Sequence, residues 1–127
     1  MKRGKVVNRY KLAETESKFA QIIWDNEPIS SGELVRKCEE KFNWKKSTTY
    51  TVLKKLCQRG IFKNEDAIVT SVITREQFDC IKSKEFVKES FSGSLPKFLA
   101  AFMGEKKIDK EEAKRLKDII DKYIEGE

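Results

Sequence analysis

Histidine is absent from the 127-residue chain. The most common general base and the most common metal ligand are therefore missing, which weighs against hydrolytic and zinc chemistry. The three cysteines, Cys38, Cys57 and Cys80, are too widely spaced for a paired metal or redox motif, and we expect them to be small buried hydrophobic residues. The sequence thus predicts a protein that is not an enzyme and that uses no metal and no cofactor.

Long hydrophobic runs are also missing. No segment approaches the roughly 18 to 20 apolar residues needed to span a bilayer. The stretch MKRGKVVNRYKL, residues 1–12, lacks the apolar run of a signal peptide. We therefore expect a cytoplasmic protein.

Charge, in contrast, is abundant: 38% of the residues are charged and 39% are hydrophobic. A chain of this size and composition is expected to have one main core and to gain further burial by dimerising. Residues 1–60 carry 14 Lys or Arg against 7 Asp or Glu, so the net charge of +6 arises in the first half. Such a basic surface attracts nucleic acid or anionic lipid, although it is also compatible with a merely solvated lysine-rich surface.

Three amphipathic helices are predicted in the first half. Residues 14–26 place Phe19, Ile22 and Ile23 at helical spacing. A second helix begins at Ser30, with Glu33 completing a capping box, and runs to about residue 42, burying Leu34, Val35 and Cys38. The third helix lies within WKKSTTYTVLKKLCQRG, residues 44–60, and ends at Gly60.

This stretch of residues 44–60 contains five basic residues and no acid. At 100° per residue, one side carries Thr49, Leu53, Leu56 and Cys57, with Tyr50 at its margin. The opposite side carries short hydroxyls, lysines and a glutamine: Ser47, Thr48, Thr51, Lys54, Lys55 and Gln58. No carboxylate occurs from Lys41 through Lys63, so this outward face is expected to be free of neutralising acids.

A β-hairpin is predicted next, from residues 61–63 and 68–73 around a polar turn at residues 64–66. Thr74 and Gln77 then open a fourth helix. Three helices followed by a hairpin form a winged helix-turn-helix, and the predicted fold class is mainly α with a small β-hairpin. We assign residues 1–74 to a DNA-binding domain and residues 75–127 to a helical dimerisation domain.

Two further helices are predicted at residues 95–103 and 110–124. We expect their apolar faces to be buried against a second copy of the chain. Folding back onto the winged helix within a monomer is the alternative. The predicted dimerisation residues are Phe86, Leu95, Phe98, Leu99, Phe102, Leu116, Ile119, Ile120 and Tyr123.

The third helix is suited to the major groove of a duplex, where short hydroxyl side chains reach base edges and lysines contact phosphates. The predicted DNA contacts are Lys45, Lys46, Ser47, Thr48, Tyr50, Thr51, Lys54 and Lys55. A dimer would present two such helices to a palindromic operator. Glu65 and Asp66 make the hairpin tip a poor phosphate contact. The alternatives are that the hydroxyls only cap the helix, or that the domain is an adaptor that binds an acidic protein.

Four strings resemble the BlaI/MecI penicillinase-repressor family of bacterial regulators: IIW ending the first helix, W-x-x-x-T entering the third, KKLCQRG closing it, and SGSL before the last helices. The resemblance spans residues 12–124. It implies a homodimer with an N-terminal winged helix and a C-terminal helical region that binds a dyad operator and represses transcription.

The resemblance also implies a partner. Repressors of this family are inactivated when a membrane metalloprotease sensor, triggered by a cell-wall antibiotic, cuts between an Asn and a Phe in the penultimate helix. Here the aligned pair is Ala101 and Phe102. The sequence departs from the family at Lys45, Lys46 and Ser47, where Ser-Pro-Lys is usual, and at Tyr50, where a longer polar side chain is common. The copper-sensing branch has a C-terminal cysteine cluster, and this chain has no cysteine after Cys80.

Overall fold

The computed structural model of the chain describes residues 10–124. The chain divides into two compact units, one ending at Phe86 and the other beginning at Val87, and each is described by itself. None of the described helices combines the length and the apolar character that crossing a membrane requires. The expectation about a signal peptide rests on residues 1–12, of which the first nine lie outside the described part.

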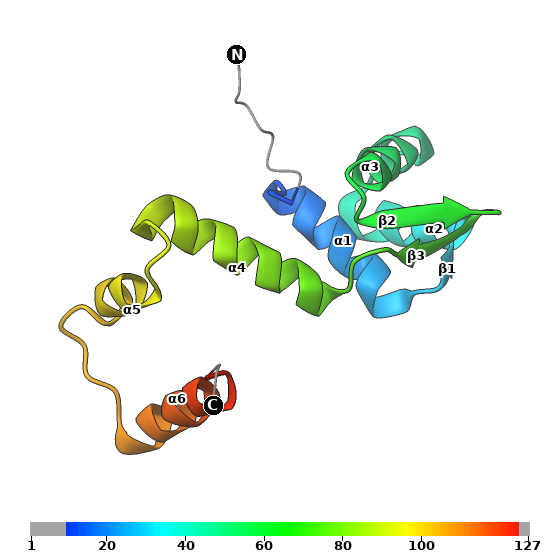
Figure 1. Ribbon diagram of the computed structural model, residues 1–127. Helices are drawn as coiled ribbons and strands as arrows, with labels where there is room; N and C mark the ends of the chain where they lie inside the picture. Colours follow the sequence, from blue (N-terminus) through cyan, green and yellow to red (C-terminus); the bar gives the residue numbers. More distant parts are fainter. Residues whose placement is uncertain (1–9, 125–127) are drawn as a thin grey trace, which may run out of the picture. The chain divides into compact units, whose positions relative to one another are not determined.

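Helices dominate the fold, as the sequence predicted (Figure 1). The first three are followed by an antiparallel hairpin, which confirms the winged helix. In chain order the elements are α1 (Glu14–Asn26), β1 (Ile29–Ser30), α2 (Ser31–Phe42), α3 (Lys46–Gln58), β2 (Phe62–Glu65), β3 (Ile68–Ser71), α4 (Arg75–Phe91), α5 (Leu95–Met103) and α6 (Lys110–Lys122).

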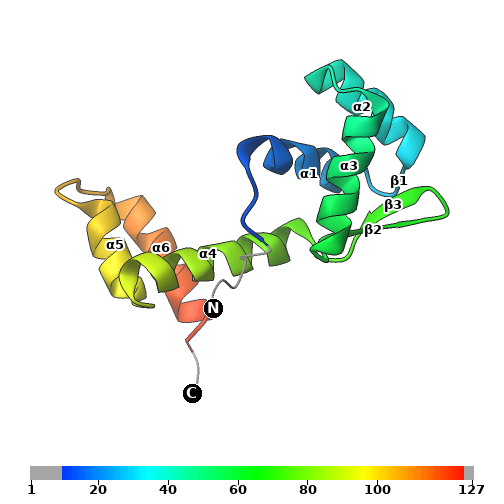
Figure 2. The same ribbon diagram turned by 90° about the horizontal axis from the view of Figure 1, so that it is seen from above.

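The sheet has three antiparallel strands in the order β1-β3-β2, and the hairpin of β2 and β3 extends away from the helices (Figures 1 and 2). The strand β1 was not predicted, because two residues carry no periodic signal. It pairs Ile29 with Val69 and Ser30 with Ile68. This pairing fixes the start of α2 beside the hairpin.

The predicted position of the hairpin turn was wrong. Asn64 and Glu65 belong to β2, and the turn is formed by Asp66 and Ala67. These two residues have φ values of 54° and 63°. Two consecutive left-handed residues match the right-handed twist of a hairpin, and Asp tolerates this conformation better than most side chains.

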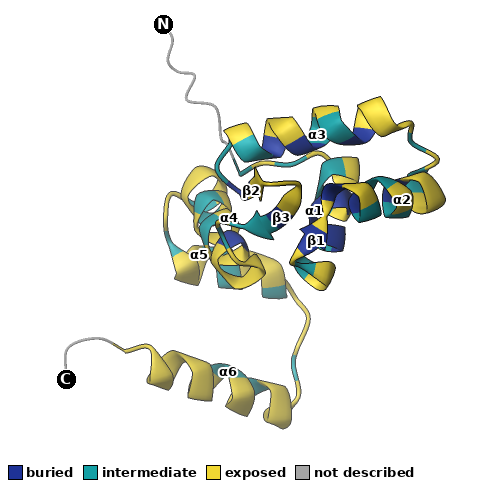
Figure 3. Ribbon diagram, turned by 90° about the vertical axis from the view of Figure 1, so that its right-hand side faces the viewer, coloured by how far each residue is buried: buried dark blue, intermediate teal, exposed yellow. Residues whose placement is uncertain are grey.

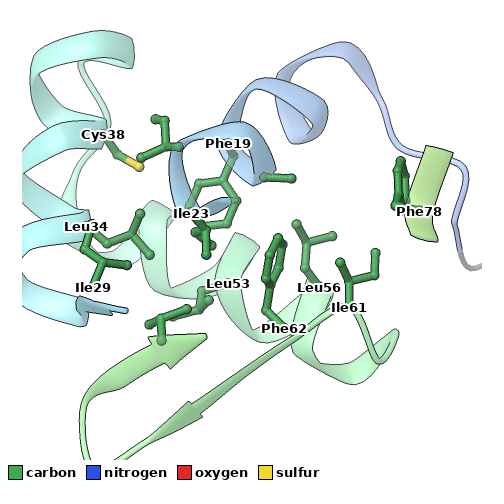
Figure 4. Close-up of a cluster of buried hydrophobic side chains, with 13 residues drawn as sticks. Phe19, Ile23, Ile29, Leu34, Cys38, Leu53, Leu56, Ile61, Phe62 and Phe78 are labelled. Atoms are coloured by element: carbon green, nitrogen blue, oxygen red, sulfur yellow. The ribbon is translucent and has the colours of Figure 1, made fainter. Parts of the chain in front are cut away.

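A single core fills the first unit (Figure 4). The predicted α1 residues Phe19, Ile22 and Ile23 are all buried in it. In α2, Leu34 and Cys38 are buried, but Val35 is only half-buried, contrary to the prediction. The other buried apolar residues come from α1, from the remaining elements of this unit and from the turn before β2: Ala20, Ile29, Leu53, Leu56, Ile61, Phe62, Val69 and Phe78.

The cysteines do not share one environment. Cys38 is buried and Cys57 is half-buried, and burial raises the pKa of both thiols. Cys80 is exposed on α4, so the prediction that it is a buried residue was wrong. Because α4 buries only Phe78 among its residues, most of that helix lies outside the core.

Two aromatic clusters involve the tryptophans. The Trp24 ring lies 5.3 Å from both Phe62 and Phe78 between ring centroids, and its Nε1 donates to the Ile73 carbonyl at 3.0 Å. Trp24 thus joins α1 to the hairpin and to the start of α4. Trp44 lies in the α2–α3 turn, 5.8 Å from Phe19 and 4.8 Å from Phe42 between centroids.

Side-chain caps begin α2 and α4. The Ser30 hydroxyl accepts from the Glu33 N–H at 3.1 Å, as predicted. The other half of the predicted box was wrong, because the Glu33 carboxylate pairs with Arg36 instead of reaching back to the Ser30 N–H. Thr74 and Gln77 form the complete predicted box: the Thr74 N–H donates to Gln77 Oε1 at 2.9 Å, and the Gln77 N–H donates to Thr74 Oγ1 at 3.0 Å. These caps satisfy amides that the helix itself leaves without partners.

The second unit contains α5 and α6, neither of which has a buried residue. Asp109 caps α6 as predicted, its Oδ1 accepting from the Glu112 N–H at 2.8 Å. The exposed large apolar residues of this unit are Leu95, Phe102, Ile119, Ile120, Tyr123 and Ile124. Figure 3 shows α6 exposed along almost its whole length. The rest of the second unit therefore does not cover these apolar side chains.

Candidate nucleic-acid interface

The two sides of α3 differ as the helical spacing predicted. Thr49, Leu53 and Leu56 are buried and face the core, which holds the helix against α1, α2 and the hairpin. Figure 3 shows the opposite side of α3 exposed. The exposed residues of α3 are Lys46, Ser47, Thr48, Thr51, Lys54, Lys55 and Gln58.

The start of α3 has no side-chain cap. Lys45 occupies the N-cap position with extended backbone, and its side chain makes no capping hydrogen bond. The first turn also lacks an acid. The positive end of the helix dipole and the amides of the first turn are therefore not neutralised locally, and Lys45 and Lys46 add two charges there. Such a helix end favours an anion.

The short hydroxyl side chains lie on the exposed side within the first two turns. Thr51 Oγ1 donates to the Ser47 carbonyl at 2.9 Å. This hydrogen bond leaves the oxygen lone pairs of Thr51 available as acceptors and fixes its methyl group. Ser47 and Thr48 are also exposed.

Tyr50 lies at the border between the two sides, as the spacing predicted. Its ring packs against the core, and its hydroxyl donates to Ser31 Oγ at 3.1 Å. The hydroxyl therefore connects α3 to the first residue of α2. A side chain held in this way supports the position of α3, in addition to any contact its exposed edge can make.

The lysines of α3 and of its N-cap position fall into two groups. Lys45, Lys46 and Lys54 are exposed, and none of them forms a salt bridge within residues 10–124. Lys55 differs, because its Nζ lies 3.0 Å from Glu16 Oε2 on α1. The prediction that no acid neutralises this face was therefore wrong at Lys55. The sequence window showed no acid because Glu16 is 39 residues away along the chain.

Glu16 is the centre of a small charge cluster. Its side chain is only 14% exposed, compared with 49% for Lys55. Arg59 Nη1 lies 3.6 Å from Glu16 Oε1, and the Ala13 N–H donates to the same oxygen at 3.0 Å. Burial acts to raise the pKa of Glu16, but the Ala13 hydrogen bond and the two cations together hold that pKa below its ordinary value. Glu16 thus connects the first turn of α1 to the C-terminal half of α3.

The hairpin is held by a second acid that the sequence did not reveal. Glu27 follows α1, and its Oε1 accepts from the Ser71 N–H at 2.8 Å and from the Ser71 hydroxyl at 2.9 Å. At the far end of the hairpin, Lys63 lies 3.7 Å from Glu65 between their charged atoms. The tip remains acidic, with Asp66 exposed.

Residues 12–122 match the family described as "Penicillinase repressor". This match covers most of the chain, including both units. The chain belongs to the penicillinase repressor family. Proteins of this family are regulatory and bind DNA; they are not enzymes. The family resemblance expected from the four sequence strings is confirmed.

Named relatives of the penicillinase repressor family match at low identity but over nearly their full length. The penicillinase repressor of Bacillus licheniformis is 20% identical over 116 residues, which is 88% of this chain and 91% of the relative. The methicillin resistance regulatory protein MecI of Staphylococcus aureus is 20% identical over 117 residues, which is 89% of this chain and 95% of the relative. The MecI protein of Mammaliicoccus sciuri matches to the same extent.

Proposed function

We propose that the protein is a transcriptional repressor that binds a palindromic operator as a homodimer. The unit ending at Phe86 supplies the DNA-binding surface, and the helices of the unit beginning at Val87 supply the dimer contact. The observation that carries the proposal is the exposed side of α3, where hydroxyl side chains stand beside lysines that form no salt bridge within residues 10–124. Family membership supports the same conclusion.

In this proposal α3 lies in the major groove. Ser47, Thr48 and Thr51 approach base edges, because their side chains are short and occupy the first two turns. Lys45, Lys46 and Lys54 contact phosphates on either side of the groove. The hairpin tip stays away from the backbone, since Glu65 and Asp66 would be repelled by phosphates.

The dimer proposal rests on the exposed apolar surface of α5 and α6. Phe102 and Tyr123 are each 73% exposed, and Ile119 and Ile120 are about half exposed. Aromatic and branched aliphatic side chains of this size are unfavourable in water, and each contributes about 1.5 to 3 kcal/mol when fully buried. A second copy of the same helices would cover them, and a two-fold dimer would place two α3 helices on one face of a duplex.

The experiment that tests the function is selection from a pool of random duplexes by the full-length protein. A repressor of this kind enriches a palindrome with a fixed distance between half-sites, because the dimer sets the separation of the two α3 helices. No enrichment, together with tight binding to an acidic protein, would instead favour the adaptor. Salt dependence alone does not separate the two, since both depend on the same lysines.

Release by proteolysis is the finer part of the proposal. The Ala101–Phe102 bond lies near the C-terminal end of α5, and both residues are exposed. Cleavage there by a membrane metalloprotease sensor would remove α6 and with it part of the dimer contact. Mass spectrometry of the protein from cells treated with a cell-wall antibiotic would show a product ending at Ala101. An intact chain under inducing conditions would exclude this route.

A further inference from the structure

Tyr50 lies beside the side chains that are proposed to reach bases. The sequence predicts a DNA contact for it, but the function proposed above assigns it none. It is within one helical turn of Ser47, Thr48 and Thr51. Its ring packs against the core, and its hydroxyl donates to Ser31 Oγ at 3.1 Å. A phenol has a single proton, so a hydroxyl that donates to Ser31 has none left for an acceptor on a base.

The acceptor of this hydrogen bond, Ser31, is itself held in place. It is only 7% exposed and is the first residue of α2, directly after β1. Its N–H donates to the carbonyl of Ala67 in the hairpin turn at 2.8 Å, and β1 pairs with β3. The sheet therefore sets the position of the oxygen that accepts from Tyr50.

The hydrogen bond adds direction to the attachment of α3. Buried leucines hold this helix against the core, but apolar contacts have no preferred direction. A hydrogen bond, in contrast, requires a defined distance and angle. The ion pair of Lys55 with Glu16 acts on the C-terminal half of α3. The bond from Tyr50 to Ser31 acts on the N-terminal half, where the exposed hydroxyl side chains lie.

We propose that Tyr50 and Ser31 are positioning residues, which set the rotation of α3 about its axis so that the hydroxyl side chains of its first two turns face base edges. This inference rests on the proposed function. Hydrogen bonds to bases form only in a narrow range of geometry. Lysines, with long and flexible side chains, reach phosphates from many orientations of the helix. Loss of the contact between Tyr50 and Ser31 therefore reduces the preference for the operator more than the general affinity for DNA.

The test is a double-mutant cycle in the full-length protein. Tyr50→Phe removes the donor and keeps the ring in the core, and Ser31→Ala removes the acceptor from a residue that has no proposed contact with DNA. The third variant combines the two substitutions. Tyr10→Phe is the matched control, because it removes a hydroxyl from another tyrosine of the same unit, one that packs against Phe78.

Dissociation constants are measured by fluorescence anisotropy, at one salt concentration, on the duplex recovered by selection and on a scrambled duplex. The quantity compared is the ratio of the two constants. A loss of stability alone would weaken binding to both duplexes equally and leave this ratio unchanged. Thermal unfolding followed by circular dichroism records the stability of each variant separately.

We expect each single variant to lower the ratio about tenfold. One such hydrogen bond is worth a factor of about 3 or more in an equilibrium constant, and the dimer loses it twice. The double variant should lower the ratio no further, because either substitution alone breaks the contact. Tyr10→Phe should keep the wild-type ratio.

A ratio that falls in Tyr50→Phe but not in Ser31→Ala would mean that Tyr50 contacts the bases directly, and it would overturn the inference. An unchanged ratio in both variants, or losses that add in the double variant, would also overturn it. In these cases the wild type still prefers the selected duplex, and the proposed function stands. A wild-type protein that binds both duplexes equally would overturn both.

Discussion

Adjacent lysines on α3 are expected to have different roles, and replacing each by Gln separates them. Lys54 is exposed and forms no salt bridge within residues 10–124, whereas the Lys55 ammonium is held 3.0 Å from Glu16. Gln is slightly shorter than Lys but has a similar helix propensity, and it removes the charge. The two variants therefore have the same net charge and differ in which contact is lost.

The expected magnitudes follow from these contacts. Lys54→Gln removes one phosphate contact, which lowers the salt slope by about 0.9 and leaves stability within about 0.5 kcal/mol of the wild type. Lys55→Gln removes an ion pair in which Lys55 is half exposed, worth about 0.2 to 1 kcal/mol. Arg59 stays near Glu16 and limits the loss, so a decrease in Tm of about 1 to 3 °C is expected, with the salt slope unchanged.

The assay pairs salt-dependent anisotropy on one duplex with thermal unfolding followed by circular dichroism. The reasoning is refuted if Lys55→Gln lowers the salt slope as much as Lys54→Gln does and leaves Tm unaltered. That result would mean that Lys55 leaves Glu16 and binds a phosphate instead. If Lys54→Gln lowers the salt slope and Lys55→Gln lowers only Tm, Glu16 is the residue that keeps one α3 cation from the duplex.

Three further results are expected. Thr51→Val removes the hydroxyl of Thr51, and Thr51→Ser removes its methyl group. Because Thr51 is proposed to contact a base, at least one of these two variants should reduce discrimination against a mismatched half-site by about 1 to 3 kcal/mol in competition binding. Ile120→Asp should give monomers in analytical ultracentrifugation, whereas Lys114→Asp, on the opposite side of α6, should remain dimeric. If both variants are monomeric, or both are dimeric, the proposed interface is contradicted. The pKa of Glu16 is lowered in the folded state, so its ion pairs stabilise the fold above the ordinary carboxyl pKa, and this contribution disappears as the pH falls through the lowered value. Glu16→Gln should therefore lose less stability than the wild type between pH 6 and pH 3, and equal losses in chemical denaturation would contradict this.

Local patterns predicted most of the fold. The spacing of Phe19, Ile22 and Ile23 placed α1, and the cap at Ser30 and the box at Thr74 marked the starts of α2 and α4, because caps and amphipathic periods are encoded within a few residues. Strand β1 and the true hairpin turn were missed. Both depend on pairing with β3, and a two-residue strand has no pattern of its own.

The candidate site was predicted in outline but not in its charge pairing. Helical spacing alone separated the exposed hydroxyls and lysines of α3 from its buried leucines. The ion pair of Glu16 with Lys55, and the hydrogen bonds of Glu27 to Ser71, join residues 39 and 44 positions apart. Contacts at such separations are decided by how α1 packs on α3 and on the hairpin, which no window of the sequence contains.

The positions of the two tryptophans give this protein a built-in optical probe. Trp24 and Trp44 are the only tryptophans in the chain, and both lie in the unit that ends at Phe86. Tryptophan fluorescence, excited at a wavelength that tyrosine does not absorb, consequently reports the unfolding of that unit alone, whereas far-ultraviolet circular dichroism reports α5 and α6 as well. Superimposable denaturation curves from the two signals would show that the units unfold as one cooperative system. Separate midpoints would show that each unit is an autonomous folding domain.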